Sequence, residues 1–153
     1  MPGGADAYHG AMSRGVTLPE VVTVLVVVAL LAAVATPSLK RYLDHAAVQE
    51  AVQRYAVLHE TTRQLAIARG AITRLELDST RKTLVIAVRR SPVAWDTVDA
   101  RTLGSAALAA SRLVIMFDPI GVGYGASNSR IVFSRGAAAD TLFVSRTGRL
   151  RRS

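Results

Sequence analysis

The hydrophobic positions of the chain begin with one nearly uninterrupted apolar run. Between residues 21 and 35 only Thr23 breaks a series of Val, Leu and Ala. A helix over residues 16–36 would be about 31 Å long, close to the hydrocarbon thickness of a bilayer. A buried helix of a soluble domain is the alternative, but it would need a large part of the remaining chain to enclose it. The run therefore predicts one membrane-spanning helix over residues 16–37.

Past Pro37 the apolar positions recur at three- and four-residue steps, which is typical of an amphipathic helix. They are Leu39, Leu43, Ala47, Val48, Ala51, Val52, Tyr55, Leu58, Thr62 and Leu65. Gly70 after Arg69 is a typical C-terminal stop. Residues 38–69 are thus predicted to continue the first helix, and Tyr42 and Tyr55 are expected to be packing residues rather than binding residues.

Beyond residue 70 the period becomes that of β-strands. Strands are predicted over residues 71–78, 83–89, 112–117, 130–135, 141–146 and 149–152. Phe117, Phe133 and Phe143 fall one to a strand and are expected to share a core. Residues 91–111 are predicted to be a long connection with a short helix, and Trp95 within it is expected to be a core residue rather than a partner-binding anchor.

A carboxylate stands at the start of the apolar run. Thr17, Leu18, Pro19 and Glu20 form a T-x-x-E capping box, in which Glu20 would reach back to the Thr17 amide. Capping is a sufficient structural reason for Glu20. An ionisable residue at the edge of a membrane segment is also a functional hypothesis that requires a partner.

The charge balance is basic, with 19 Lys plus Arg against 11 Asp plus Glu. The chain finishes with Arg149, Leu150, Arg151, Arg152 and Ser153. Such a tail suits phosphate, an acidic protein surface or anionic lipid, and a solvated terminus is the simpler interpretation.

Motifs for catalysis, metals and cofactors are not found in the sequence. With no cysteine there is no disulfide or thiolate site. His45 and His59 would lie about 21 Å apart on one helix, too far to share a metal. The glycines at 121, 123 and 125 fit a hairpin loop better than a nucleotide-binding turn. We expect no enzymatic activity and no cofactor.

The start of the chain resembles a known processing signal. The positions that carry the resemblance are Gly15, Thr17, Leu18, Glu20 and Pro37. Their spacing resembles the class III signal of type IV prepilins and type II secretion pseudopilins. Counted from Val16, Glu20 is the fifth residue and Pro37 the twenty-second. The chain departs from the family at Val16, where phenylalanine is usual, and at Pro19, where isoleucine is frequent.

The resemblance implies a maturation and an assembly step. Residues 1–15 would be a leader that a prepilin peptidase removes between Gly15 and Val16, and Val16 would then be N-methylated. Glu20 of one subunit would pair with the Val16 ammonium of its neighbour, and Pro37 would belong to the same assembly helix. The implied fold is α+β and pilin-like, with the long N-terminal helix packed on an antiparallel β-sheet domain over residues 70–153 in the periplasm.

A second resemblance narrows the group. The stretch FDPIGVG, with Gly121, and the stretch SRTGR, with Gly148 and Arg149, resemble the GspH/FimT group of minor pilins and pseudopilins. This implies a minor pseudopilin of a type II secretion system that helps to export folded proteins. Its partners would be other pseudopilin subunits, the prepilin peptidase and the assembly platform of the inner membrane, which the subunit would cross once.

The alternative is a FimT-like minor type IV pilin that binds DNA for natural transformation. The matching residues are Gly148, Arg149 and Arg151, followed by Arg152. Arginines of this kind would contact phosphates without reading bases. A simpler interpretation of the same residues is an edge strand whose charges discourage aggregation.

Overall fold

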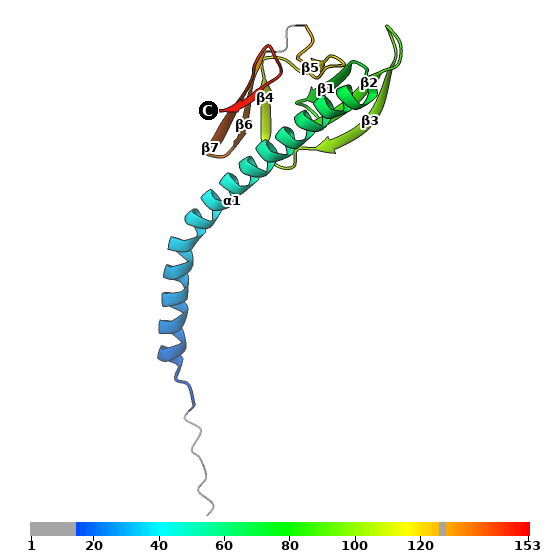
Figure 1. Ribbon diagram of the computed structural model, residues 1–153. Coiled ribbons are helices and arrows are strands. Elements are labelled where there is room, and N and C mark those ends of the chain that lie inside the picture. Colours follow the sequence, from blue (N-terminus) through cyan, green and yellow to red (C-terminus); the bar gives the residue numbers. More distant parts are fainter. Residues whose placement is uncertain (1–14, 126–127) are drawn as a thin grey trace, which may run out of the picture. The chain divides into compact units, whose positions relative to one another are not determined.

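The computed structural model describes residues 15–125 and 128–153, so most of the predicted leader lies outside the described residues. The described chain forms one long helix and eight strands (Figure 1). The helix α1 is Leu18–Arg69, and the strands are β1 (Thr73–Asp78), β2 (Thr83–Arg89), β3 (Trp95–Thr102), β4 (Ala107–Ala110), β5 (Val114–Phe117), β6 (Ser129–Arg135), β7 (Ala138–Val144) and β8 (Leu150–Arg152). The chain divides into two compact units, residues 1–38 and 39–153.

Within the first unit, residues 18–38 are helical. The Thr17 carbonyl accepts hydrogen bonds from the backbone amides of Glu20, at 3.1 Å, and Val21, at 3.2 Å. Thr17 therefore occupies the N-cap, as predicted. Pro19 lies in the first turn, where its missing N–H costs nothing. The Thr23 hydroxyl donates to the Pro19 carbonyl at 2.8 Å. Thr23, the polar residue within the apolar run, thus satisfies its hydroxyl group on the helix backbone.

The second unit contains two four-stranded antiparallel sheets, β3-β2-β1-β5 and β4-β6-β7-β8. One apolar cluster joins them to the C-terminal half of α1. It includes Val48, Ala51, Val52 and Tyr55 of the helix, Leu75, Leu84 and Ile115 of the first sheet, and Ile131, Phe133 and Leu142 of the second. The predicted α+β architecture, a long N-terminal helix with antiparallel sheets packed against its C-terminal half, is therefore confirmed.

The prediction for residues 91–111 is wrong, because two strands lie there. β3 is an edge strand that exposes most of its side chains, so it carries no apolar alternation. β4 has only four residues, three of them alanine. Trp95 is also not a core residue: it is half-buried beside the guanidinium carbons of Arg74 and Arg89, which lie 4.5 and 5.8 Å from its ring centre.

Two further aromatic predictions are wrong. Phe117 and Phe133 are fully buried, but Phe143 is 43% exposed, because its neighbours Leu142 and Val144 take the inward positions of β7. Tyr55 is fully buried as predicted, whereas Tyr42 is 70% exposed. Of the apolar stripe, Leu39 and Leu43 are exposed, so the buried face of α1 begins only after them.

Gly148 lies where the chain passes close to the core. Its φ of +78° is in the left-handed region, and an added Cβ would lie 2.6 Å from Cε1 of Phe117. Gly104 has nearly the same φ, +77°, but an added Cβ there would meet nothing within 4 Å. The two glycines therefore separate conformational strain from steric overlap.

Gly148→Ala should lower the free energy of unfolding by about 2–4 kcal/mol, since strain and overlap add. Gly104→Ala, with strain alone, should cost about 1 kcal/mol. Denaturant unfolding of the full chain in detergent, followed by Trp95 fluorescence, measures both. Equal losses would show that the Phe117 contact does not constrain residue 148.

His59 is a titratable side chain in the core. It is 2% exposed and lies edge-on to Phe117, with ring centres 5.1 Å apart. Its Nε2 atom has no hydrogen-bond partner among the described residues. Burial lowers the pKa of His59 from 6.5 to about 4, while Glu60 acts to raise it and Arg63 to lower it. The folded protein therefore holds this imidazole neutral.

The unfolded chain binds a proton at His59 below its ordinary pKa of 6.5, whereas the folded chain binds one only near pH 4. The free energy of unfolding should therefore fall by about 3 kcal/mol as the pH drops from 6.5 to 4. Above pH 6.5, His59 should cause no further change in that free energy. His59→Phe should remove this component. His45→Gln, a change at an exposed histidine of α1, should retain it in the same pH series of denaturant titrations.

Candidate functional site

The predicted cleavage site is accessible. Residues 15–17 precede α1 without regular structure, and Val16 is 71% exposed. An added Cβ on Gly15 would meet nothing within 4 Å. The fold therefore gives no packing reason for glycine at this position.

Glu20 lies in the first turn of α1 and is exposed. The expected capping bond from the Thr17 amide to its carboxylate is not formed, and Thr17 contacts the first turn through its carbonyl. No ion pair joins Glu20 to any residue in the region of the chain that the structure describes. A carboxylate at the start of an apolar helix thus has no ion-pair partner among residues 15–125 and 128–153.

The helix that follows Glu20 exposes apolar side chains all round. Val24, Leu25, Leu30, Leu31 and Val34 are between 57% and 75% exposed. By length and composition α1 is able to cross a membrane. Soluble monomers rarely expose a contiguous apolar surface of this size. Among the described residues, no side chain covers this surface. Pro37 lies inside α1, which continues to Arg69.

The three arginines of the C-terminal tail are not equivalent. Nη2 of Arg152 lies 2.5 Å from Oδ2 of Asp140 and donates to Oε1 of Gln49 at 2.7 Å, so this arginine ties β8 to β7 and α1. Arg149 and Arg151 are exposed, and neither has an ion-pair partner within the described ranges 15–125 and 128–153. Only two of the three predicted contact residues are thus available to an external anion.

The structure adds two residues that the sequence prediction missed. Phe143 lies directly opposite Arg130 of β6 on one side and Arg151 of β8 on the other. Directly opposed residues of antiparallel strands point to the same face. Arg130, Phe143 and Arg151 are all exposed, and they form one row across the outer face of this sheet. The alternation of Leu142, Phe143 and Val144 was the signal, but it does not say which set points inward.

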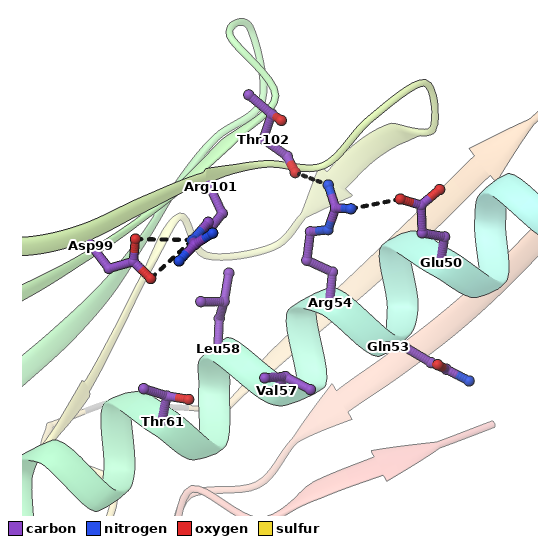
Figure 2. Close-up of a pocket in the computed structure, with 9 residues that line it drawn as sticks. All are labelled: Glu50, Gln53, Arg54, Val57, Leu58, Thr61, Asp99, Arg101 and Thr102. Carbon is purple, nitrogen blue, oxygen red and sulfur yellow. Dashed lines mark hydrogen bonds and ion pairs between the residues drawn. The ribbon is translucent and has the colours of Figure 1, made fainter.

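A groove lies between α1 and the edge strand β3, with a cavity of about 680 Å³ (Figure 2). Its charged side chains satisfy one another. Arg54 bonds to Glu50 and to the Thr102 carbonyl, each at 2.6 Å, and Arg101 lies 3.0 Å from Asp99. Among residues 15–125 and 128–153 there is no group of three His, Asp or Glu placed to hold a metal. The groove offers no unpaired charge for catalysis.

The sequence matches no protein-family model and no curated protein. Solved structures do match. The type IV minor pilin FimU of Pseudomonas aeruginosa is 16% identical, with a TM-score of 0.58 over 69% of this chain and 87% of FimU. A second crystal form of FimU matches with 13% identity and the same TM-score, over 69% of this chain and 91% of FimU.

The minor pseudopilin EpsH, from the type 2 secretion system of Vibrio cholerae, matches with a TM-score of 0.54 and 13% identity. The match covers 68% of this chain and 96% of EpsH. The chain has the pilin fold. Similarity at this level of identity shows the fold and leaves the choice between pilus and secretion system open.

Within this pilin fold, the two glycine motifs have a structural role. The Gly121 carbonyl accepts a hydrogen bond from Nε of Arg63 at 2.9 Å, and an added Cβ on Gly121 would lie 2.7 Å from the Ile67 side chain. Gly148 likewise passes close to Phe117. Both motifs close a loop onto the core of the second unit, so they point to a shared fold rather than to a shared ligand.

Proposed function

We propose that the chain is a minor pilin or pseudopilin, a filament subunit that is made as a membrane-anchored precursor. The observation that carries the proposal is the combination at the start of α1. An exposed Gly15–Val16 bond precedes Glu20, which has no ion-pair partner among the described residues, and an apolar helix that no described residue covers follows. Soluble domains have no use for this combination. A subunit that passes from a bilayer into a helical filament core needs all three features.

Cleavage after Gly15 would create an α-ammonium group on Val16, which the same peptidase system would methylate. Placed beside Glu20 of a neighbouring subunit, it would neutralise a carboxylate that is costly to bury alone. The proposed partners are other pilin-type subunits, the prepilin peptidase and the inner-membrane assembly platform. Residues 16–37, including Pro37, would span the inner membrane once, and the β-sheet domain would lie in the periplasm.

For the machine itself, we put a type II secretion pseudopilus of the GspH kind first, because the basic tail that a DNA-binding subunit would need is short and its Arg152 is already paired with Asp140. A FimT-like pilus subunit that binds DNA is the second candidate. Arg149 and Arg151 support this candidate, because both are exposed and have no ion-pair partner among the described residues. Arg152 is bound to Asp140, so the tail offers two available arginines instead of the three expected. Salt-sensitive binding of duplex DNA would favour the pilus subunit, and its absence would favour the secretion subunit.

Gly15→Asp should block processing, because a carboxylate would occupy the position beside the scissile bond. Co-expression with a prepilin peptidase and intact-mass measurement should show the uncut chain. Gly10→Asp is the control, since it adds the same charge to the same leader and should leave cleavage normal. Normal maturation of Gly15→Asp would contradict the precursor assignment.

Glu20→Gln should leave cleavage intact, since it lies beyond the scissile bond, but should abolish incorporation into filaments. The amide keeps the shape and removes the charge that an ammonium group requires. Sheared filaments probed for the subunit provide the measurement. Glu60→Gln, an exposed carboxylate later on α1, is the control. Undiminished incorporation of Glu20→Gln would reduce Glu20 to a helix-start residue.

A further inference from the structure

The outer face of the strands β6, β7 and β8 presents an aromatic ring between two cations. Phe143 is 43% exposed, and its cross-strand neighbours on that face are Arg130 and Arg151. Adjacent strands lie about 4.8 Å apart, so the two arginine backbones are separated by about 10 Å with the ring between them. A large apolar side chain exposed at the centre of a sheet face has no role in the core.

The charge of this face is positive. Neither Arg130 nor Arg151 has an ion-pair partner among the residues that the structure describes, and Arg149, two residues before Arg151, is likewise unpaired there and exposed. The nearby carboxylate, Asp140, lies three residues before Phe143 on β7 and is bound to Arg152. The row therefore meets solvent as two unneutralised guanidinium groups.

Shallow hollows flank the ring on both sides. One, of about 280 Å³, is lined by Phe143 and Arg130 together with Ser111, Asn128, Ser129 and Val144. The other, of about 290 Å³, is lined by Phe143, Arg151, Arg152 and Ser153. Each hollow combines the phenyl ring with a guanidinium donor. A ligand along the row would find the same pair of chemical groups twice.

We infer that this face binds single-stranded nucleic acid, with one unpaired base stacked on Phe143 and flanking phosphates held by Arg130 and Arg151. Aromatic side chains on a basic sheet surface bind single strands because every base offers a π-face and every nucleotide a phosphate. A duplex hides its base faces in its own stack and would use only the arginines. This inference rests on the second candidate function and extends its contact surface from the tail residue Arg151 to Phe143 and Arg130 on the neighbouring strands.

Stacking on a ring and contacts to phosphates do not distinguish one base from another, so the binding should tolerate different sequences. The test uses the full chain in detergent micelles with two fluorescent probes, a 20-nucleotide oligothymidylate and a 20-base-pair duplex, each titrated across a salt series. The unmodified chain should bind the single strand more tightly than the duplex.

Phe143→Ala should weaken binding of the single strand about tenfold or more, the loss expected for one stacked base, and should leave duplex binding unchanged. Tyr124→Ala is the matched control, because Tyr124 is also 43% exposed but lies in the loop after β5. It should change neither affinity.

The double variant Arg130→Gln with Arg151→Gln should bind the single strand with a weaker salt dependence. The negative slope of log affinity against log salt should become less steep by about 1.4, the value for two phosphate contacts on a single strand. The double variant Arg54→Gln with Arg101→Gln removes the same number of charges from arginines that are paired with Glu50 and Asp99 away from this face, and it should have a much smaller effect on the slope.

Tighter binding of the duplex than of the single strand, together with a Phe143→Ala variant that binds as the unmodified chain does, would overturn the inference. The arginines of the C-terminal tail would then be the contact surface for duplex DNA. Absence of binding to either probe at low salt would overturn both the inference and the DNA-binding candidate. A Phe143→Ala variant that impairs only self-association would also overturn it, since a sister subunit would then cover the face. None of these results touches the processing of Gly15, which the mass measurement tests separately.

Discussion

One continuous helix carries two different burial requirements, and the rest of the protein depends on that constraint. Over residues 18–38, α1 exposes side chains that are nearly all apolar, and water is an unfavourable solvent for them. In the C-terminal half of the helix a single stripe is buried, with Ala51 and Tyr55 fully covered by the core. The second requirement is met inside the chain. The first is not met by any of the described residues, and in the proposed function a bilayer or other helices would meet it.

The second unit is fastened by arginines as well as by its apolar core. Arg135 lies 3.1 Å from Asp44 of α1, and Arg63 of α1 donates to the Gly121 carbonyl at 2.9 Å. Arg152 joins Asp140 in the same way. The charge of +8 is therefore a poor guide to the binding surface by itself. The binding surface depends on which guanidinium groups are not already bonded to other residues of the fold.

The sequence predicted those regions of the fold that have a local period. The helix and the strands β1, β2 and β5–β8 all follow from apolar spacing. β3 and β4 were missed, since an exposed edge strand and four mostly alanine residues have no such period. Phe143 was misplaced for a related reason: alternation along β7 defines two faces, and only packing decides which of them is buried.

The sequence by itself determined where α1 starts, that its apolar part is long enough to cross a membrane, and how Gly15, Glu20 and Pro37 are spaced. These features depend only on distance along the chain and on local composition. The tertiary structure alone decided that Arg152 is engaged and that Arg130, Phe143 and Arg151 share one face. Strand register sets that arrangement. Register depends on which face of each strand meets the core, and residues far apart in the chain contribute to it.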